Sequence, residues 1–395
     1  MRNLTIGVPK ESYPGERRVA LVPLAIPSLT KAGFEIVLEQ GAGAEAGYPD
    51  ALYVEKGTKI LPERAAVFAQ ADLIVQVLCY GSNDVTGKAD LSLMRRGQGL
   101  VGFLRPLGSL EVIEEIAQTG VSSFSVELMP RTTRAQSMDA LSSMGTLCGY
   151  KAVLLAAVTL PKIFPMLTTA AGTITPAKVF VIGAGVAGLQ AIATARRLGA
   201  VVSAYDMRPA AKEQVKSLGG RFVELPIEAK HAEDARGYGT AQDEGFYARQ
   251  RELLALAVAE NDIVITTAVV PGKQAPVLIT SDMVAKMAPG SVIVDLAAER
   301  GGNCELTQAG ETVIEHAVTI IGHINLASEV PYHASQMYAR NLTAFVLHLA
   351  KDGTLRTNDD EIIRETLLTH QGEIVNARVR QFFGLSESMA EQEPR

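Results

Sequence analysis

The first third of the chain alternates short apolar runs with stretches of helical periodicity. Five apolar runs predict strands, at residues 4–8, 34–38, 73–77, 99–104 and 121–126. Residues 24–32 predict a helix that ends at Gly33. Strands that are apolar throughout, with helices between them, are typical of a parallel sheet covered on both faces. This region of the chain is therefore predicted to form an α/β domain.

A long helix and a second alternation of strands and helices follow. The helical pattern runs from residue 135 to about 160, where Pro161 and Pro165 interrupt it. Six more runs predict strands, at residues 178–182, 201–205, 221–224, 262–266, 291–296 and 318–321. Residues 330–349 predict another long helix, and the polar tail from residue 354 predicts one more helix through 383. The predicted fold is α/β, with two Rossmann-like, doubly wound parallel-sheet domains joined by long helices.

Two long helices on either side of the second domain indicate that the chain crosses between the domains twice. We expect an N-terminal Rossmann-like domain of residues 1–136, completed by the C-terminal helices in residues 329–395. The second domain, with its connecting helix, is expected at residues 137–328. The length of 395 residues agrees with two domains, because single cores stop growing at roughly 250–300 residues.

Charge and cysteine content exclude several classes of protein. The net charge of −6 argues against a nucleic-acid partner. The three cysteines, Cys79, Cys148 and Cys304, are widely spaced, so neither a disulfide framework nor a metal site is predicted. The apolar stretch at residues 152–175 is interrupted by Lys162 and two prolines. We therefore expect a cytoplasmic chain with no direct membrane insertion.

A glycine-rich turn follows the predicted strand at residues 178–182. Its sequence, GAGVAG, places glycine at positions 183, 185 and 188, and the next helix begins within it. Gly183 permits a tight turn, Gly185 lets a pyrophosphate approach the backbone, and Gly188 lets the helix pack on the strand. The helix N-terminus offers N–H groups and a positive dipole to the phosphates. This context predicts a dinucleotide site.

An acidic residue ends the next predicted strand. Asp206 lies about 20 residues beyond the glycines, where such a residue binds the hydroxyls of the adenosine ribose. Its charge repels a 2′-phosphate, so we predict NAD (NADH) rather than NADP, although Arg208 lies close by. Six further residues are expected to complete the cofactor site: Ala184, Val186, Met207, Arg208, Thr266 and Ala268.

Three segments point to a particular family. They are RTTRAQSMDALSS at residues 131–143, VDLAAERGGN at 294–303, and PKE at 9–11 with ERRVA at 16–20. With the glycine-rich turn they resemble the NAD(H)-binding alpha subunit (domain I) of proton-translocating NAD(P) transhydrogenase, over nearly the whole chain. The fold of that family is shared with alanine dehydrogenase, its relative.

The resemblance implies direct hydride transfer between NAD(H) on this chain and NADP(H) on a partner subunit. It also implies a homodimer that associates with membrane-spanning and NADP(H)-binding subunits, peripherally at the inner face of the cytoplasmic membrane. A mobile loop at residues 230–245, with Tyr238 at its tip, would fold over the bound NAD(H). The alternative for this polar, glycine-containing segment is a solvated linker.

The resemblance also implies which residues surround the nicotinamide: Arg131, Gln136, Asp139 and Ser142. Gln136 and Ser142 can hydrogen-bond the carboxamide or its ribose, and Asp139 can hold Arg131 in a charge-assisted pair. The spacing of Gln136 and Asp139 puts them on one face of the predicted helix. From the residues alone, capping of a helix N-terminus explains this polar cluster as well.

Two other functions remain open at this point. A soluble alanine-type dehydrogenase would use an arginine for the substrate carboxylate, which Arg18 matches, and a lysine and a histidine where this chain has Gln76 and Arg105. Since glutamine does not titrate and arginine does not exchange a proton near neutral pH, this activity is disfavoured. A nucleotide-sensing module without catalysis is the non-enzymatic alternative. His323 and His333 are expected to be structural, and Glu299 and Asn325 to have minor binding roles.

Overall fold

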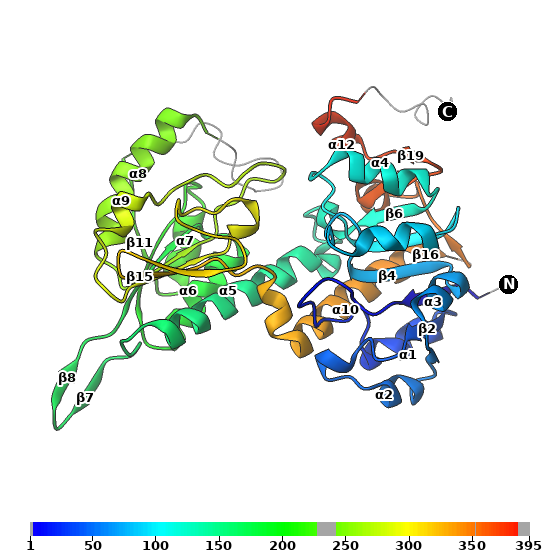
Figure 1. Ribbon diagram of the computed structural model, residues 1–395, viewed down its shortest axis with the longest axis horizontal. Coiled ribbons are helices and arrows are strands. Elements are labelled where there is room, and N and C mark those ends of the chain that lie inside the picture. The colour runs from blue at the N-terminus through cyan, green and yellow to red at the C-terminus, as the bar shows by residue number, and fades with distance from the viewer. Residues whose placement is uncertain (1–2, 227–241, 352, 386–395) are drawn as a thin grey trace. The chain divides into compact units, whose positions relative to one another are not determined.

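The protein is described from a computed structural model, which covers residues 3–226, 242–351 and 353–385 (Figure 1). The chain divides into two compact units, one from Met1–Met144 with Ser328–Arg395 and one from Gly145–Ala327. Each contains a mainly parallel sheet with helices against it, so the predicted α/β class with two Rossmann-like domains is confirmed. The chain leaves the first unit near the start of one long helix, α5 (Ala140–Thr159).

The sheet of the first unit has the strand order β19-β18-β6-β5-β4-β1-β2-β3. Its strands are β1 (Thr5–Val8), β2 (Glu35–Glu39), β3 (Lys59–Leu61), β4 (Leu73–Leu78), β5 (Gly99–Phe103), β6 (Ser122–Ser125), β18 (Leu367–His370) and β19 (Glu373–Ile374). Strands β1 to β6 pair in parallel, and β18 adds to β6 in the antiparallel direction. The middle strands are buried along their length, as their apolar sequences predict.

The described residues of this unit form the helices α1 (Ile26–Lys31), α2 (Asp50–Val54), α3 (Arg64–Gln70), α4 (Leu110–Gln118), α10 (Pro331–Leu349), α11 (Glu361–Thr366) and α12 (Ala377–Phe382). The long helix α10 packs on the sheet through aromatic side chains. The ring of Phe345 meets that of Phe124 at 6.1 Å, and Tyr338 lies 5.7 Å from Phe103. Helix α10, which follows the second unit in sequence, therefore contributes to the core of the first unit.

The C-terminal segment differs from its prediction as a single helix through residue 383. It contains α11, the hairpin β18–β19 and α12, preceded by the short pair β16 (Ala350–Lys351) and β17 (Thr354–Leu355). The hairpin turns at Gln371 and Gly372, which both have positive φ values, of 51° and 98°. A two-residue turn with positive φ at both positions has a backbone twist that fits the right-handed twist of the two antiparallel strands. Helix α11 has already ended at Thr366, and this turn sends the chain from β18 back along β19.

The sheet of the second unit has the strand order β11-β10-β9-β12-β13-β15-β14. They are β9 (Lys178–Ile182), β10 (Val201–Tyr205), β11 (Arg221–Phe222), β12 (Ile263–Thr266), β13 (Val292–Asp295), β14 (Thr312–Glu315) and β15 (Val318–Ile321). All these pairs are parallel except β14 with β15. The strand order reverses between β9 and β12, and the carboxyl ends at such a point are where open α/β sheets bind ligands.

Helices cover both faces of this second sheet. They are α5, α6 (Val186–Arg197), α7 (Ala211–Ser217), α8 (Glu244–Ala259) and α9 (Ser281–Val284). Along β9, Val179 and Val181 join one core cluster with residues of α5 and α6, whereas Phe180 and Ile182 join another with residues of α8 and α9. Alternate side chains thus enter opposite cores, which explains why residues 179–182 of the strand are all apolar.

A hairpin that the sequence pattern did not predict extends from the second unit (Figure 1). It consists of β7 (Leu167–Thr169) and β8 (Gly172–Ile174), all of whose residues are exposed. It follows α5, which among the described ranges is the one helix long and apolar enough to cross a membrane. In this structure Ala152, Val153 and Ala156 of α5 are fully buried in the core of the second unit.

Candidate dinucleotide site

The glycine-rich turn lies at the carboxyl end of β9, at the point where the strand order reverses. Gly183 has a φ of 97°, a conformation that favours glycine, and the hydroxyl of Thr267 donates to its carbonyl at 2.9 Å. A Cβ on Gly188 would lie 1.8 Å from the same carbonyl oxygen, so only glycine lets α6 pack this closely. A Cβ on Gly185 would have no heavy atom within 4 Å. The space above Gly185 is open.

The N-terminus of α6 has the chemistry that a pyrophosphate requires. Gly185 is the N-cap and has no side chain to satisfy the first N–H groups, and the first turn contains no acidic residue. The twelve residues of the helix end with Arg196 and Arg197, which complement the opposite end of its dipole. Open space, available N–H groups and a positive helix end fit the phosphates of a dinucleotide.

Asp206 follows β10 directly and faces the glycine-rich turn. Its Oδ2 accepts from the backbone N–H of Ala184 at 2.7 Å, so the acid and the turn form one structure. The side chain of Arg208 donates to both carboxylate oxygens at 3.0 Å. The structure therefore brings the predicted ribose acid, the predicted phosphate turn and Arg208 together.

A buried network behind the site was missed by sequence reasoning. Asp295, at the end of β13, accepts from the hydroxyl of Thr266 at 2.8 Å and from that of Thr307 at 2.7 Å. It also accepts from the backbone N–H groups of residues 297, 303 and 304. Thr266 is fully buried and its hydroxyl is directed to Asp295, into the protein. The acidic residue at a strand end, inside the segment VDLAAERGGN, was the available signal.

Asn303 extends this network to a second strand end. Its Oδ1 accepts from the N–H of Ala268 at 2.9 Å, and its Nδ2 donates to the carbonyl oxygens of Ala268 and Pro276 at 2.8 and 2.9 Å. The backbone of Ala268, predicted to contact the cofactor, is thus fixed on both sides. Asp295 and Asn303 position the loops that follow β12 and β13.

The segment predicted to surround the nicotinamide belongs to the first unit. Gln136 is exposed and lies in a 3-10 helix (Gln136–Met138), not in α5. Asp139 then caps α5, accepting from the N–H of Ser142 at 2.9 Å and from its hydroxyl at 2.6 Å. The expectation that Gln136 and Asp139 share a face of one α-helix is wrong, because the cap at Asp139 begins a new helix.

The backbone of this segment is held by residues distant in sequence. Asn341 of α10 donates to the carbonyl of Ser137 at 2.8 Å. Arg134 pairs with Asp360 at 3.2 Å, and Asp360 also lies 2.8 Å from His348. Arg131 and Gln136 are exposed on this segment, whose backbone and side chains are held by α10 and by Asp360.

The positions that an alanine-type dehydrogenase would use are occupied differently. Arg18 is buried and forms a two-point ion pair with Glu16, with distances of 2.8 and 2.5 Å. Gln76 is buried and its Nε2 donates to Asp90 at 3.3 Å. Arg105, after β5, has a φ of 48° and lies 3.8 Å from Asp84. The two positions therefore hold a buried amide within β4 and a permanent cation after β5.

One buried carboxyl group of the first unit has a shifted pKa. Glu11 accepts from the N–H groups of Val77 and Leu78 at 2.6 and 3.0 Å, where the pairing of β4 is irregular. Burial, with a smaller effect of the neighbouring Glu16, raises the pKa of Glu11 to about 8. This carboxyl group therefore holds its proton at neutral pH.

Other predicted residues have the following places. Glu299 and Asn325 are brought together, since Oε1 of Glu299 accepts from the N–H of Asn325 at 3.0 Å. His323 is 3.2 Å from the hydroxyl of Thr312, and His333 packs edge-on against Tyr332. Tyr238 and most of the segment 230–245 lie outside the described residues.

Comparison with known proteins identifies the family. The family model for the N-terminal domain of alanine dehydrogenase/PNT matches residues 7–148, and that for the C-terminal domain matches residues 152–377. The chain belongs to the alanine dehydrogenase/PNT family. The resemblance found in the sequence is thereby confirmed, and the match extends over nearly all described residues.

Within this family, the chain is more similar to two transhydrogenase chains than to an alanine dehydrogenase. An NAD(P) transhydrogenase subunit alpha chain of Rhodospirillum rubrum is 45% identical over 377 residues, which cover 94% of this chain and 98% of the relative. A solved transhydrogenase structure from Sinorhizobium meliloti has a TM-score of 0.81 at 42% identity, covering 95% of this chain and 99% of that one. The alanine dehydrogenase of Mycolicibacterium smegmatis is 27% identical over 385 residues, covering 95% of this chain and 96% of the relative.

Proposed function

We propose that this chain is the NAD(H)-binding alpha subunit of a proton-translocating NAD(P) transhydrogenase. It binds NAD(H) in the second unit and exchanges hydride directly with NADP(H) held on a partner subunit. The observation that carries this proposal is the presence of Gln76 in β4 and of Arg105 after β5, at the positions where an alanine-type dehydrogenase would use a lysine and a histidine. Oxidation of an amino acid needs a group that accepts a proton, whereas hydride exchange between two nicotinamides needs none.

The residues of the second unit fit NAD(H). The N–H groups at the start of α6 bind the pyrophosphate above Gly185, and Asp206 binds the adenosine ribose. Asp295 and Asn303 fix the loops after β12 and β13 that border the site. Bound NAD(H) supplies a transferable hydride at C4 of its nicotinamide.

Polar residues of the segment 131–142 position the reacting rings. Gln136 and Ser142 orient the nicotinamide carboxamide or its ribose, and Arg131 lies beside the reacting face. Asp139 holds Ser142 through two hydrogen bonds, so its contribution is to position that residue. Since the reaction transfers no proton to the chain, alignment of the rings is the main catalytic contribution.

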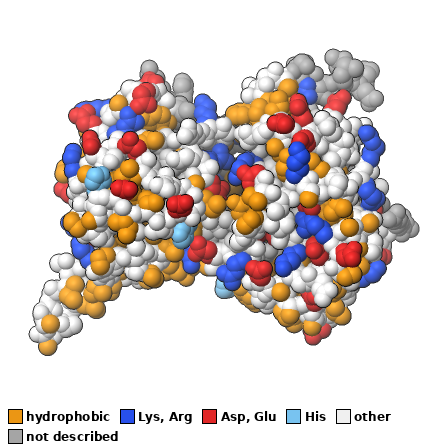
Figure 2. All heavy atoms as spheres, viewed as in Figure 1, with side chains coloured by type: hydrophobic (Ala, Val, Ile, Leu, Met, Phe, Trp, Pro, Cys, Tyr) orange, Lys and Arg blue, Asp and Glu red, His pale blue; other side chains and the backbone are white. Residues whose placement is uncertain are grey.

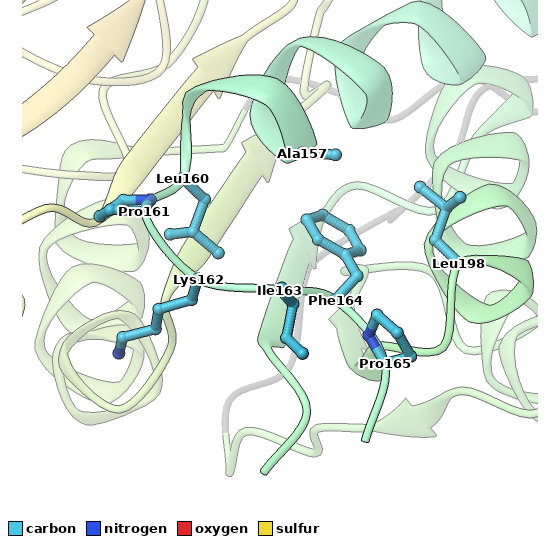
Figure 3. Close-up of a pocket in the computed structure, with 8 residues that line it drawn as sticks. All are labelled: Ala157, Leu160, Pro161, Lys162, Ile163, Phe164, Pro165 and Leu198. Carbon is cyan, nitrogen blue, oxygen red and sulfur yellow. The ribbon is translucent and has the colours of Figure 1, made fainter. Parts of the chain in front are cut away.

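A homodimer is the proposed form of this chain, with the β7–β8 hairpin at its interface. Met166 and Ile174 are 64% and 49% exposed, and hydrophobic side chains lie along this hairpin (Figure 2). Beside its base is an apolar hollow of about 640 Å³ (Figure 3). It is lined by Ala157, Leu160, Pro161, Lys162, Ile163, Phe164, Pro165 and Leu198. Apolar surface of this kind is expected to be covered by a second copy.

The remaining partners follow from the reaction. We propose that an NADP(H)-binding subunit supplies the second nicotinamide and that a membrane-spanning subunit conducts the protons. This chain would then associate peripherally with the inner face of the cytoplasmic membrane through those subunits. Its own described residues hold the NAD(H) side of the reaction.

The deciding experiment uses NADH that carries deuterium at the transferable C4 position. Mixed with the NADP(H)-binding component of a transhydrogenase, the full chain should deliver the deuterium to NADP⁺ with none lost to water. Oxidation of NADH by pyruvate and ammonia at an ordinary enzymatic rate, about 1–10³ per second, would instead assign an alanine-type dehydrogenase. Tight NADH binding with no transfer, even with the partner present, would assign a nucleotide-sensing module.

A further inference from the structure

Asp206 and Arg208 form a two-point ion pair at the position that determines whether the site binds NAD(H) or NADP(H). Oδ1 of Asp206 accepts from the backbone N–H of Arg208 at 2.8 Å and from its Nε at 3.0 Å. Oδ2 accepts from the N–H of Ala184 at 2.7 Å and from Nη2 of Arg208 at 3.0 Å. A carboxylate has about four acceptor positions. All four are therefore filled, and the guanidinium group occupies two of them.

This occupancy has a consequence for the ribose. The 2′- and 3′-hydroxyls of an adenosine ribose can donate to Asp206 only where an acceptor position is vacant. The two bonds from backbone N–H groups belong to the turn itself, whereas the two from the guanidinium group end on a flexible side chain. The guanidinium group must therefore give way when the ribose binds.

The same pair places a cation beside the position of a 2′-phosphate. The side chains of Asp206 and Arg208 are 6% and 17% exposed, so solvent screens this charge pair less than it screens a surface pair. An arginine near this strand end is the residue type that accommodates a 2′-phosphate in NADP-binding sites. Here that arginine is held by the acid that favours NAD.

We propose that Asp206 selects NAD(H) in two ways: its carboxylate accepts from the ribose hydroxyls of NAD(H), for which the guanidinium group gives way, and its charge competes with the 2′-phosphate of NADP(H) for Arg208. The proposal rests on the NAD(H) site of the proposed function and deepens it. It makes Arg208 a specificity-determining residue whose effect depends on its neighbour. With the carboxylate charge removed, Arg208 binds the 2′-phosphate and the site accepts NADPH.

The test compares dissociation constants of NADH and NADPH for the full chain and four variants. Asp206→Asn should bind NADH more weakly and NADPH at least roughly tenfold more tightly than the wild type does, because a charge-assisted contact to phosphate is gained. The double variant Asp206→Asn/Arg208→Gln should lose the gain for NADPH. The gain should also fall with added salt, because anions compete with the 2′-phosphate for the guanidinium group.

A matched control removes a neighbouring cation. Lys212 lies near the start of α7 and pairs with Glu224 at 2.6 Å, not with Asp206. The variant Asp206→Asn/Lys212→Gln should therefore keep the gain for NADPH. Loss of the gain in this variant to the same extent as with Arg208→Gln would overturn the proposal, since the effect would then come from general positive charge.

The single variant Arg208→Gln provides a test that leaves the Asp206–Ala184 contact in place. It should widen the ratio of the NADPH and NADH dissociation constants, because the ribose no longer competes with the guanidinium group and the Asp206 charge is no longer neutralised. An unchanged ratio, or an Asp206→Asn variant that gains no NADPH affinity although a thermal melt shows it folded, would overturn the proposal. Failure of the proposed function would give a different result, because the wild-type chain would then not bind NADH.

Discussion

Two glycines of the same turn should respond to alanine in different ways. At Gly188, a Cβ would lie 1.8 Å from the carbonyl oxygen of Gly183, whereas real contacts of this kind essentially never fall below 3.0 Å. The start of α6 must therefore move by at least about 1.2 Å, the difference between these two distances. Overpacking of this size costs about 1–3 kcal/mol of stability. The displaced N–H groups are also no longer directed at the pyrophosphate. Gly188→Ala should therefore lower both stability and NADH affinity.

Gly185→Ala is the matched change. The φ of Gly185 is −76°, which any residue adopts, and no heavy atom lies within 4 Å of the added Cβ. Stability should stay within about 0.5 kcal/mol of the wild type. The methyl group instead enters the open space above the turn and separates the N–H groups from the phosphates. Loss of one charge-assisted hydrogen bond, about 1.5–3 kcal/mol, weakens NADH binding roughly 10- to 150-fold.

The assay is urea denaturation followed by circular dichroism, together with NADH titration. The chain contains no tryptophan, so binding is followed by the fluorescence of NADH itself or by calorimetry. A Gly185→Ala variant that binds NADH like the wild type would refute the assignment of this turn to the pyrophosphate. Equal losses of stability in both variants would refute the packing argument for Gly188.

Three further results are expected. Folding raises the pKa of Glu11 to about 8, whereas in the unfolded chain the pKa of this carboxyl group is near 4.5. Between these two values the folded chain keeps a proton that the unfolded chain releases. Stability should therefore fall between about pH 5 and 8, by up to roughly 1.4 kcal/mol per unit, and Glu11→Gln should remove this component of the slope in urea titrations at several pH values. Gln136→Asn should slow hydride transfer roughly 10²-fold in single-turnover experiments and leave the NADH dissociation constant almost unchanged, since a positioning contact moves by about 1 Å; an equal loss of binding would contradict this role. Ile174→Asp on the exposed hairpin should yield monomers in light scattering, whereas Val54→Asp, at a 56% exposed apolar position on α2 of the first unit, serves as the control.

Features encoded in a short stretch of sequence were predictable. The turn at residues 183–188, the strand before it and Asp206 after the next strand all depend on neighbouring residues. Their geometry in the structure follows from the same steric rules that the sequence expresses, including the positive φ of Gly183. The strands of both sheets were predictable for the same reason, because burial on two faces favours apolar residues at most positions, although β6 contains three buried serines.

Features that depend on distant partners were not predictable. The run Leu367–His370 becomes a strand because β6 offers it an edge, and nothing within the run itself distinguishes a strand from a helix. Four of the five hydrogen bonds to Asp295 come from residues 297–307, but the fifth comes from Thr266 of the neighbouring strand β12, a pairing that forms only when the sheet does. Likewise, the cap at Asp139 divides a continuous helical pattern into a 3-10 turn and α5.

The arrangement of the first unit, built from both ends of the chain, determines the order in which the protein can be completed during synthesis. Ser123 of β6 contacts Thr369 of β18 across 246 residues, so the sheet stays open at β6 until the ribosome has made β18. The second unit, continuous from Gly145 to Ala327, has no such delay. We expect the nucleotide-binding unit to fold first on the nascent chain, while the exposed edge of β6 awaits its partner and depends on chaperones for protection from aggregation.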